Sequence, residues 1–215
     1  MWQLVDLTLR YYRRWLAFAW GMALAIAVMV QILTSLNRSG DAPRLAFLLA
    51  GLFLVLASMV VGIMIQATDS SEKRARLLMT LPVTRDQLAL AQVLSPLAVL
   101  ALGVVVGSAA SLAGTLLGAG AAESRPFPLP LFIAGQTGFY MYFPTLIPAI
   151  GAYWQRGRRR AALGIGFLLV LGFAFLTFLQ LGSVEIPGKQ ALTLLPVVLS
   201  TGLTYQLLRR RRSFA

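Results

Sequence analysis

Six long stretches of the chain carry no charged side chain, and they alternate with short segments in which the charges gather. The uncharged stretches are residues 15–37, 45–68, 87–122, 126–155, 161–184 and 190–208. Each is mostly apolar and close to or above the roughly 20 residues that an α-helix needs to cross a bilayer. Buried helices of soluble proteins rarely run so long. The pattern predicts an all-α polytopic membrane protein, a single membrane domain over residues 1–215. Its six transmembrane helices are expected at 15–36, 45–67, 88–117, 130–153, 161–182 and 190–208.

The basic residues lie mainly in alternate connecting segments. Of the 19 Lys and Arg, 15 precede the first span, separate the second from the third and the fourth from the fifth, or follow the sixth. Because basic segments stay on the cytoplasmic side, both termini are expected in the cytoplasm. The run Arg209–Arg212 is better suited to anionic headgroups than to nucleic acid. Arg outnumbers Lys 17 to 2, as in high-GC bacteria, so the expected location is the bacterial plasma (inner) membrane.

The composition excludes several kinds of chemistry. Only 12% of the residues are charged, about half the usual share in a soluble domain, and there is no Cys and no His. Disulfides, Cys/His metal sites and Ser-His-Asp catalysis are therefore excluded. The predicted spans hold no ionisable Asp, Glu, Lys or Arg, which disfavours proton- or sodium-coupled carriers and intramembrane enzymes. The sequence also lacks a phosphate-binding loop, so no cofactor is expected on this chain and ATP hydrolysis would need a separate subunit.

The N-terminal arm, residues 1–14, has a polar and an apolar side. On a helix the polar residues share one stripe: Gln3, Asp6, Arg10, Arg13 and Arg14. The apolar residues fall opposite: Trp2, Val5, Leu9 and Tyr12. This pattern is typical of an amphipathic helix that lies in the headgroup plane. A plain extension of the first span is the alternative.

Uncharged polar residues and prolines interrupt the fourth predicted span. Pro144 and Pro148 each remove a backbone donor. Broken membrane helices are tolerated where they are buried in protein or line a cavity. The span therefore offers candidates for a translocation surface: Gln136, Tyr140, Tyr142 and Pro144. The alternative for each polar side chain is a hydrogen bond to another helix. In the third span, the spacing of Gly103 and Gly107 permits close helix packing, either within the chain or in a dimer.

The segment between the second and third spans predicts a short helix held between two membrane helices. Asp69 and Glu72 have the spacing of a capping box, an amphipathic stretch follows to Leu81, and Pro82 ends it. Thr84 and Gln87 form a second capping pair that opens the third span.

This segment resembles the permeases of the ABC type-2 exporter superfamily. The residues that carry the resemblance are an acidic residue, an apolar pair, Leu-Pro, and a hydroxyl residue before a basic one: Glu72, Leu77-Leu78, Leu81-Pro82 and Thr84-Arg85. The layout of an amphipathic N-terminal helix and six spans with both ends inside is similar too. The resemblance implies that residues 69–82 are the coupling helix that docks on a cytoplasmic ATPase subunit. The residues expected to couple are Glu72, Arg74, Leu77, Leu78, Leu81 and Pro82.

The resemblance also implies the partners. ATP and Mg would bind the ATPase subunit, and a second copy or a similar permease would complete the transporter. Permease contacts are expected through the first and fifth spans, with Gly164, Gly172, Phe175 and Phe178 available for packing. The loop at 183–189 is short, as in compact exporters of amphiphilic or hydrophobic compounds. A non-transporting membrane scaffold or signalling partner, or an independent channel or carrier, remains the alternative.

Overall fold

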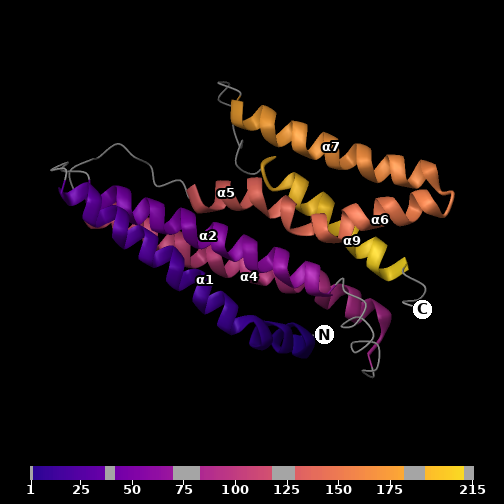
Figure 1. The fold of residues 1–215 in the computed structure, drawn as a ribbon, viewed down its shortest axis with the longest axis horizontal. Helices are drawn as coiled ribbons and strands as arrows, with labels where there is room; N and C mark the ends of the chain where they lie inside the picture. Colours follow the sequence, from indigo (N-terminus) through magenta and orange to yellow (C-terminus); the bar gives the residue numbers. More distant parts are fainter. Residues whose placement is uncertain (1, 37–41, 70–82, 118–128, 182–191, 211–215) are drawn as a thin grey trace.

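The computed structural model describes residues 2–36, 42–69, 83–117, 129–181 and 192–210, and no strand occurs among them. The helices, shown in Figure 1, are α1 (Trp2–Leu36), α2 (Ala42–Asp69), α4 (Arg85–Leu117), α5 (Leu129–Gly138), the 3-10 helix η1 (Phe139–Tyr142), α6 (Phe143–Gln155), α7 (Arg159–Leu181) and α9 (Leu195–Arg210). The all-α prediction is confirmed.

Three of the described helices are long and apolar enough to cross a membrane. The stretches are Leu49–Thr68 of α2, Arg85–Ala113 of α4 and Arg159–Leu179 of α7. The other predicted spans correspond to the second part of α1, to the interrupted series α5–η1–α6 and to the 16-residue α9. Length and composition thus support three of the six spans, and the fourth is broken as its prolines predicted.

The N-terminal arm and the first predicted span form one continuous helix, α1, so the expected boundary between a separate interfacial helix and the span is absent. Residues 10–20 contain neither Gly nor Pro to interrupt it. The apolar side of the arm packs partly on protein: Tyr12 is buried with Val61, Ile65 and Val99 of α2 and α4. The polar side is exposed and carries an ion pair at 2.7 Å between Asp6 and Arg10.

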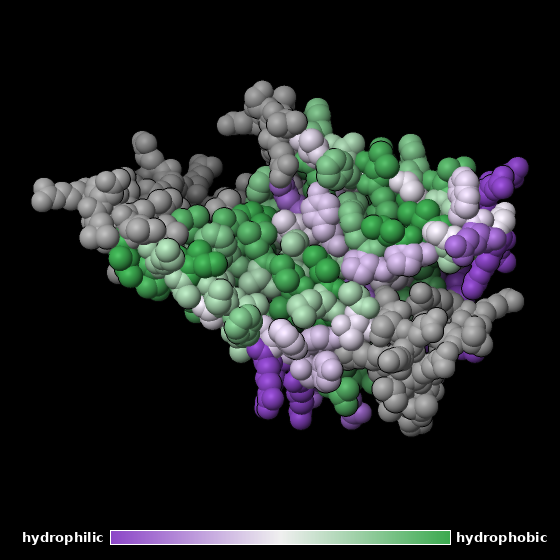
Figure 2. Space-filling model, in the orientation of Figure 1, coloured by the Kyte–Doolittle hydropathy of each residue, from purple (hydrophilic) through white to green (hydrophobic). Residues whose placement is uncertain are grey.

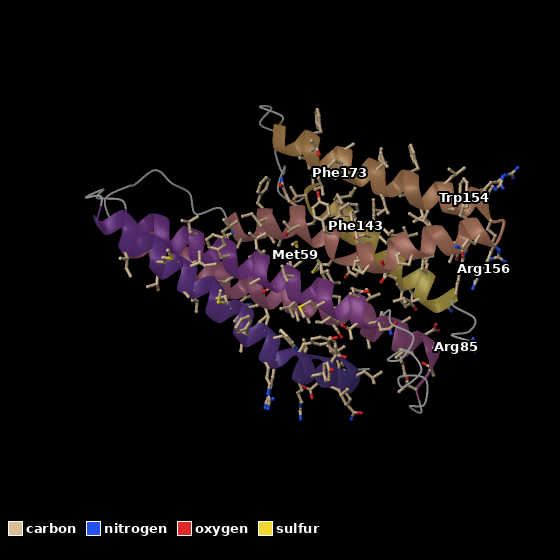
Figure 3. All side chains as sticks on the ribbon, in the orientation of Figure 1. Met59, Arg85, Phe143, Trp154, Arg156 and Phe173 are labelled. Atoms are coloured by element: carbon tan, nitrogen blue, oxygen red, sulfur yellow. The ribbon has the colours of Figure 1, made fainter. Side chains whose placement is uncertain are left out.

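The long helices run in alternating directions when the series α5–η1–α6 is taken as one segment, as Figure 1 shows. One end of the molecule therefore holds five parts of the chain: the start of α1, the end of α2, the start of α4, the α6–α7 turn and the end of α9. Arg85 and Arg156 are both at this end in Figure 3. In Figure 2 hydrophilic side chains gather here and below the N-terminal part of α1, while apolar side chains cover much of the surface between. The fold thus brings basic residues from separate segments to the same end.

Small residues allow α2 and α4 to approach closely. A Cβ added to Gly107 would lie 2.8 Å from the backbone oxygen of Gly51, and one added to Gly103 would collide with Ser58. The Ser58 hydroxyl accepts a 2.9 Å hydrogen bond from the indole of Trp20, which ties α1 to the same pair. The glycine spacing in the third predicted span therefore serves packing within the chain.

The start of α4 and the α6–α7 turn have well-defined caps. Thr84 and Gln87 make the predicted reciprocal capping box, with N–O distances of 3.2 and 3.3 Å. At the turn, Gly157 has a φ of +73°. Its N–H bonds to the Trp154 carbonyl and that of Arg158 to the Tyr153 carbonyl, the pattern of a Schellman motif. These bonds join α6 and α7 into one hairpin.

Candidate functional site

The fourth hydrophobic segment changes from α-helix to 3-10 helix and back within a few residues. α5 ends at Gly138, η1 spans Phe139–Tyr142, and α6 starts at Phe143. Pro144 has no N–H, so it cannot continue an α-helix from α5, but it fits the first turn of α6, where no intrahelical donor is required. The Phe143 N–H bonds to the Tyr140 carbonyl three residues back. The break is thus a consequence of proline placement.

The break is held inside the protein. Phe139, Met141 and Tyr142 are buried, and η1 contacts both α2 and α9. A Cβ on Gly138 would lie 2.8 Å from Leu100 of α4, and one on Gly62 would lie 2.5 Å from the Met141 sulfur. Glycines on both sides therefore allow the 3-10 turn to pack closely against α2 and α4.

A buried polar bridge, formed by Gln66, Thr145 and the Gln92 carbonyl, connects the break to α2 and α4. The Gln66 side-chain amide donates to the Gln92 carbonyl at 2.8 Å, and its oxygen accepts from the Thr145 hydroxyl at 2.7 Å. One turn before Thr145, the Tyr142 hydroxyl donates to the Val93 carbonyl at 3.2 Å. All three side chains are buried. In a low-dielectric interior, satisfied polar groups of this kind fix the relative position of helices.

The position of this bridge along the helices matters. Gln66 lies three residues before the end of α2 at Asp69, and Gln92 lies two turns into α4. These are the two helices that flank segment 70–82. The bridge therefore joins the end of α2 and the first turns of α4 directly to the start of α6.

The candidate translocation residues do not share one surface. Gln136 and Tyr142 are buried, whereas Tyr140 and Pro144 are half-buried. The Tyr140 ring packs edge-on against Phe139 and Phe143, with centroids 5.5 and 5.2 Å apart. The arrangement positions α6 and holds the break. Among the described residues, no group of three His, Cys, Asp or Glu side chains lies close enough to hold a metal ion.

The expectation that polar side chains in the spans bond to other helices is confirmed for Gln66, Tyr142 and Thr145. Gln66 and Tyr142 bond to carbonyls of α4, and Thr145 of α6 bonds to Gln66 of α2. Several shorter hydroxyls instead bond to carbonyls of their own helix: Ser95, Thr137, Thr177 and Thr201. This is the reach expected of Ser and Thr, which bond back to the preceding turn.

A second feature had no counterpart in the sequence reasoning. An apolar hollow of about 620 Å³ lies between α7 and α9, with Phe139 and Leu146 among its walls. None of the four candidate translocation residues lines it. Its walls come from three separate parts of the chain, so no local pattern indicates it.

The residues expected to couple to an ATPase lie outside the described residues. These are Glu72, Arg74, Leu77, Leu78, Leu81 and Pro82. Of the implied dimer contacts, Gly164 has nothing within 4 Å of an added Cβ, but Gly172 packs against Phe139 of the same chain. Phe175 and Phe178 line the hollow.

The chain matches no protein-family model, no curated protein and no solved structure.

Proposed function

We propose that the chain is the permease subunit of an ATP-binding cassette transporter, a six-span protein that exports an amphiphilic or hydrophobic compound with energy from a separate ATPase. The observation that carries the proposal is the polar bridge at Gln66. It ties α2 and α4, the two helices that flank segment 70–82, to the break in the fourth hydrophobic segment. A coupling segment at this place has a direct mechanical route into the interior of the membrane domain.

The sidedness of the charges supports the same assignment. Arg10, Arg85, Arg156 and Arg209 belong to segments that the fold collects at one end. Trp154 lies at this end too, with the Arg159 guanidinium 5.6 Å from its ring centre. Trp beside Arg is typical of the bilayer–water boundary. This end would face the cytoplasm of a bacterium, and the ATPase subunit would bind there with ATP and Mg.

The packing suggests which parts move. α2 and α4 are in close contact along their length and would move together. The α6–α7 hairpin is joined by the capped turn at Gly157 and would respond through Thr145. ATP hydrolysis would displace segment 70–82, the α2–α4 pair would shift, and the hairpin would change its position relative to that pair.

A second permease copy would complete the pathway. α1 and α7 carry large apolar side chains that the chain itself leaves exposed, among them Phe18 and Met22 on α1 and Phe167 and Val170 on α7. These two helices are the ones through which the resemblance implies contact. Gly172 already packs against Phe139 of the same chain. The α7 contact with a second copy would therefore use the face of Leu163, Gly164 and Phe167.

Co-purification tests the partnership directly. Tagged chain, extracted from its native membrane in mild detergent, should retain a cytoplasmic ATPase that has a phosphate-binding loop. Leu77→Ala/Leu78→Ala should weaken this binding roughly 30-fold or more, since a central apolar anchor contributes about 2 kcal/mol or more. Leu102→Ala, at an exposed leucine of α4, is the matched control and should leave binding unchanged. Normal ATPase binding by the Leu77/Leu78 variant, correctly inserted, would contradict the proposal.

Two substitutions of Glu72 distinguish its possible roles, which are an ion pair with the ATPase and a cap on its own helix. Gln keeps the capping capacity and loses the charge, whereas Ala loses both. Loss of ATPase binding in Glu72→Gln would assign the charge to the contact. Loss only in Glu72→Ala would assign Glu72 to the cap.

The polar bridge distinguishes a transporter from a scaffold. Gln66→Met removes both hydrogen bonds at similar volume. We expect the ATPase to remain bound while transport per ATP hydrolysed falls, because the bridge transmits motion. Gln155→Met, at an exposed glutamine that ends α6, controls for the substitution itself. A scaffold would show no ATP-dependent transport in either protein.

A further inference from the structure

The hollow between α7 and α9 has the form of an open groove with apolar walls. Its α7 wall runs from Leu168 to Phe178, and its α9 wall from Leu195 to Gln206. Phe139 of η1 and Leu146 of α6 also contribute to its walls. Its volume of about 620 Å³ is within the range of small-molecule sites.

Small residues keep the groove open. Gly202 and Ala174 stand on facing helices where larger side chains would fill the space. An added Cβ at Gly202 meets nothing within 4 Å. Gly172 lets the Phe139 ring lie against the α7 backbone, 3.0 Å from the position of an added Cβ. The hollow therefore arises from residue choice on both helices.

The walls offer almost nothing to a polar ligand. Among the described lining residues, only Ser200 and Gln206 have side chains that can form hydrogen bonds. The Ser200 hydroxyl already donates to the Val197 carbonyl at 3.0 Å. Gln206 is exposed near the end of α9, one turn before Arg210. An occupant with polar groups along its length would lose hydrogen bonds here, which costs free energy. A hydrocarbon chain makes no hydrogen bonds in water, so it loses none in the groove.

The length of the groove suits one acyl chain. From Leu195 to Gln206 the α9 wall extends about 16 Å at 1.5 Å per residue. One leaflet of a bilayer has a hydrocarbon depth of about 15 Å. The groove therefore matches one extended acyl chain in its length and in its nearly complete lack of polar groups.

We propose that the α7–α9 groove binds one acyl chain of a bilayer phospholipid. The lipid replaces protein contacts that α7 lacks and fills the space between this helix and the rest of the chain. The site requires that α7 lie in a membrane, as its length and composition allow, and does not depend on the transport proposal.

Photo-crosslinking tests the site. The full-length protein is reconstituted in phosphatidylcholine vesicles that contain a small fraction of phosphatidylcholine with a diazirine near the end of one acyl chain. After irradiation, labelled peptides are mapped by mass spectrometry. We expect several-fold more label on the groove walls than on the exposed apolar face of α4 around Leu102 and Val105, which faces bulk lipid. Gly202→Trp should reduce the groove label several-fold. Gly151→Trp on α6, equally open but outside the groove, should not.

Two further measurements keep the result interpretable. Ala174→Leu narrows the groove from the opposite wall and gives the same test if Gly202→Trp fails to fold. Because the chain has no cysteine, Phe178→Cys reports a second copy through disulfide formation. Equal labelling of the groove and the α4 face, unchanged by both filling variants, would overturn the proposal. So would a disulfide-linked dimer whose groove takes up no label.

Discussion

The helices α4 and α7 both qualify as membrane spans, yet the protein covers them to different extents. Half of the best apolar window of α4 is buried within the chain, but only 22% of that of α7. α4 packs closely on α2 and also touches α1, α5 and α9, whereas α7 is held mainly by α6. Figure 1 shows α7 along the edge of the molecule. Apolar composition alone therefore does not tell which helix forms the core.

The difference lies in the small and polar residues. In a bilayer, lipid tails are as apolar as leucine, so helix association depends on close packing and hydrogen bonds. α4 has Gly103 and Gly107 placed against Ser58 and Gly51 of α2. α7 has Gly164 and Gly166, but a Cβ added at either would have no neighbour within 4 Å. Glycines of α4 thus permit close packing against α2, whereas these two glycines of α7 lie on a surface that is free for lipid or a second copy.

Replacing a leucine by alanine should show the largest difference in stability between the α2–α4 core and α7. Leu54 of α2 is 2% exposed and Leu163 of α7 is 62% exposed. Leu54→Ala should reduce the free energy of unfolding by about 2 kcal/mol, near the lower limit for buried leucines because burial from lipid gains no transfer energy. Leu163→Ala should change it by less than about 0.5 kcal/mol. Equilibrium unfolding in mixed micelles measures both, and equal losses would remove the contrast.

Substitution of a glycine by alanine should also affect stability more in α4 than in α7, although by less than the leucine substitution. Gly107→Ala places a methyl group 2.8 Å from the Gly51 backbone oxygen, so the helices must separate, at about 1–3 kcal/mol. Gly166→Ala meets nothing within 4 Å and should be neutral or stabilise by up to about 1 kcal/mol through helix propensity. Thermal inactivation midpoints of the two proteins provide the comparison. A harmless Gly107→Ala would mean that α2 and α4 are less closely packed than described.

Removal of one hydrogen bond should give the smallest effect. Thr145→Val removes the bond to Gln66, and Thr177→Val on α7 removes only a bond to its own helix. We expect about 0.6 kcal/mol for the first, the average for such interhelical bonds in membranes. For the second we expect no measurable loss. The same unfolding assay checks both, and a larger loss from Thr177→Val would show that α7 is held more firmly than its burial implies.

The sequence was sufficient to predict the helices, their order and the broken fourth segment. Charge-free stretches mark helices directly, and Pro144 marks the interruption. Pro148 lies inside α6 and does not end it. The Thr84–Gln87 cap was also predictable, because both partners lie within one turn. The polar stripe of the N-terminal arm predicted a separate interfacial helix, with a plain extension of the first span as the alternative. The structure has one continuous α1, because no residue there breaks a helix.

The site was harder to predict because its parts are distant in the chain. Gln66 and Thr145 are 79 residues apart, and each is an ordinary polar residue within its own span. The groove exists because Gly202 and Ala174 are small residues. Small residues are common in membrane helices, so the sequence around them does not indicate a groove. Tyr142 was chosen for its position in the irregular span, but its hydroxyl faces the Val93 carbonyl and holds the break in place.

Spin-label distances test most directly whether α7 moves relative to a fixed α2–α4 pair. The chain has no native cysteine, so labels at exposed sites are unambiguous. Leu102→Cys on α4 serves as the common reference for Val60→Cys on α2 and Val170→Cys on α7. We predict a narrow Val60–Leu102 distribution that does not change when the ATPase binds and turns over ATP, and a Val170–Leu102 distribution that is broader and shifts. Two equally narrow and unchanged distributions, or a shift confined to Val60–Leu102, would contradict this account.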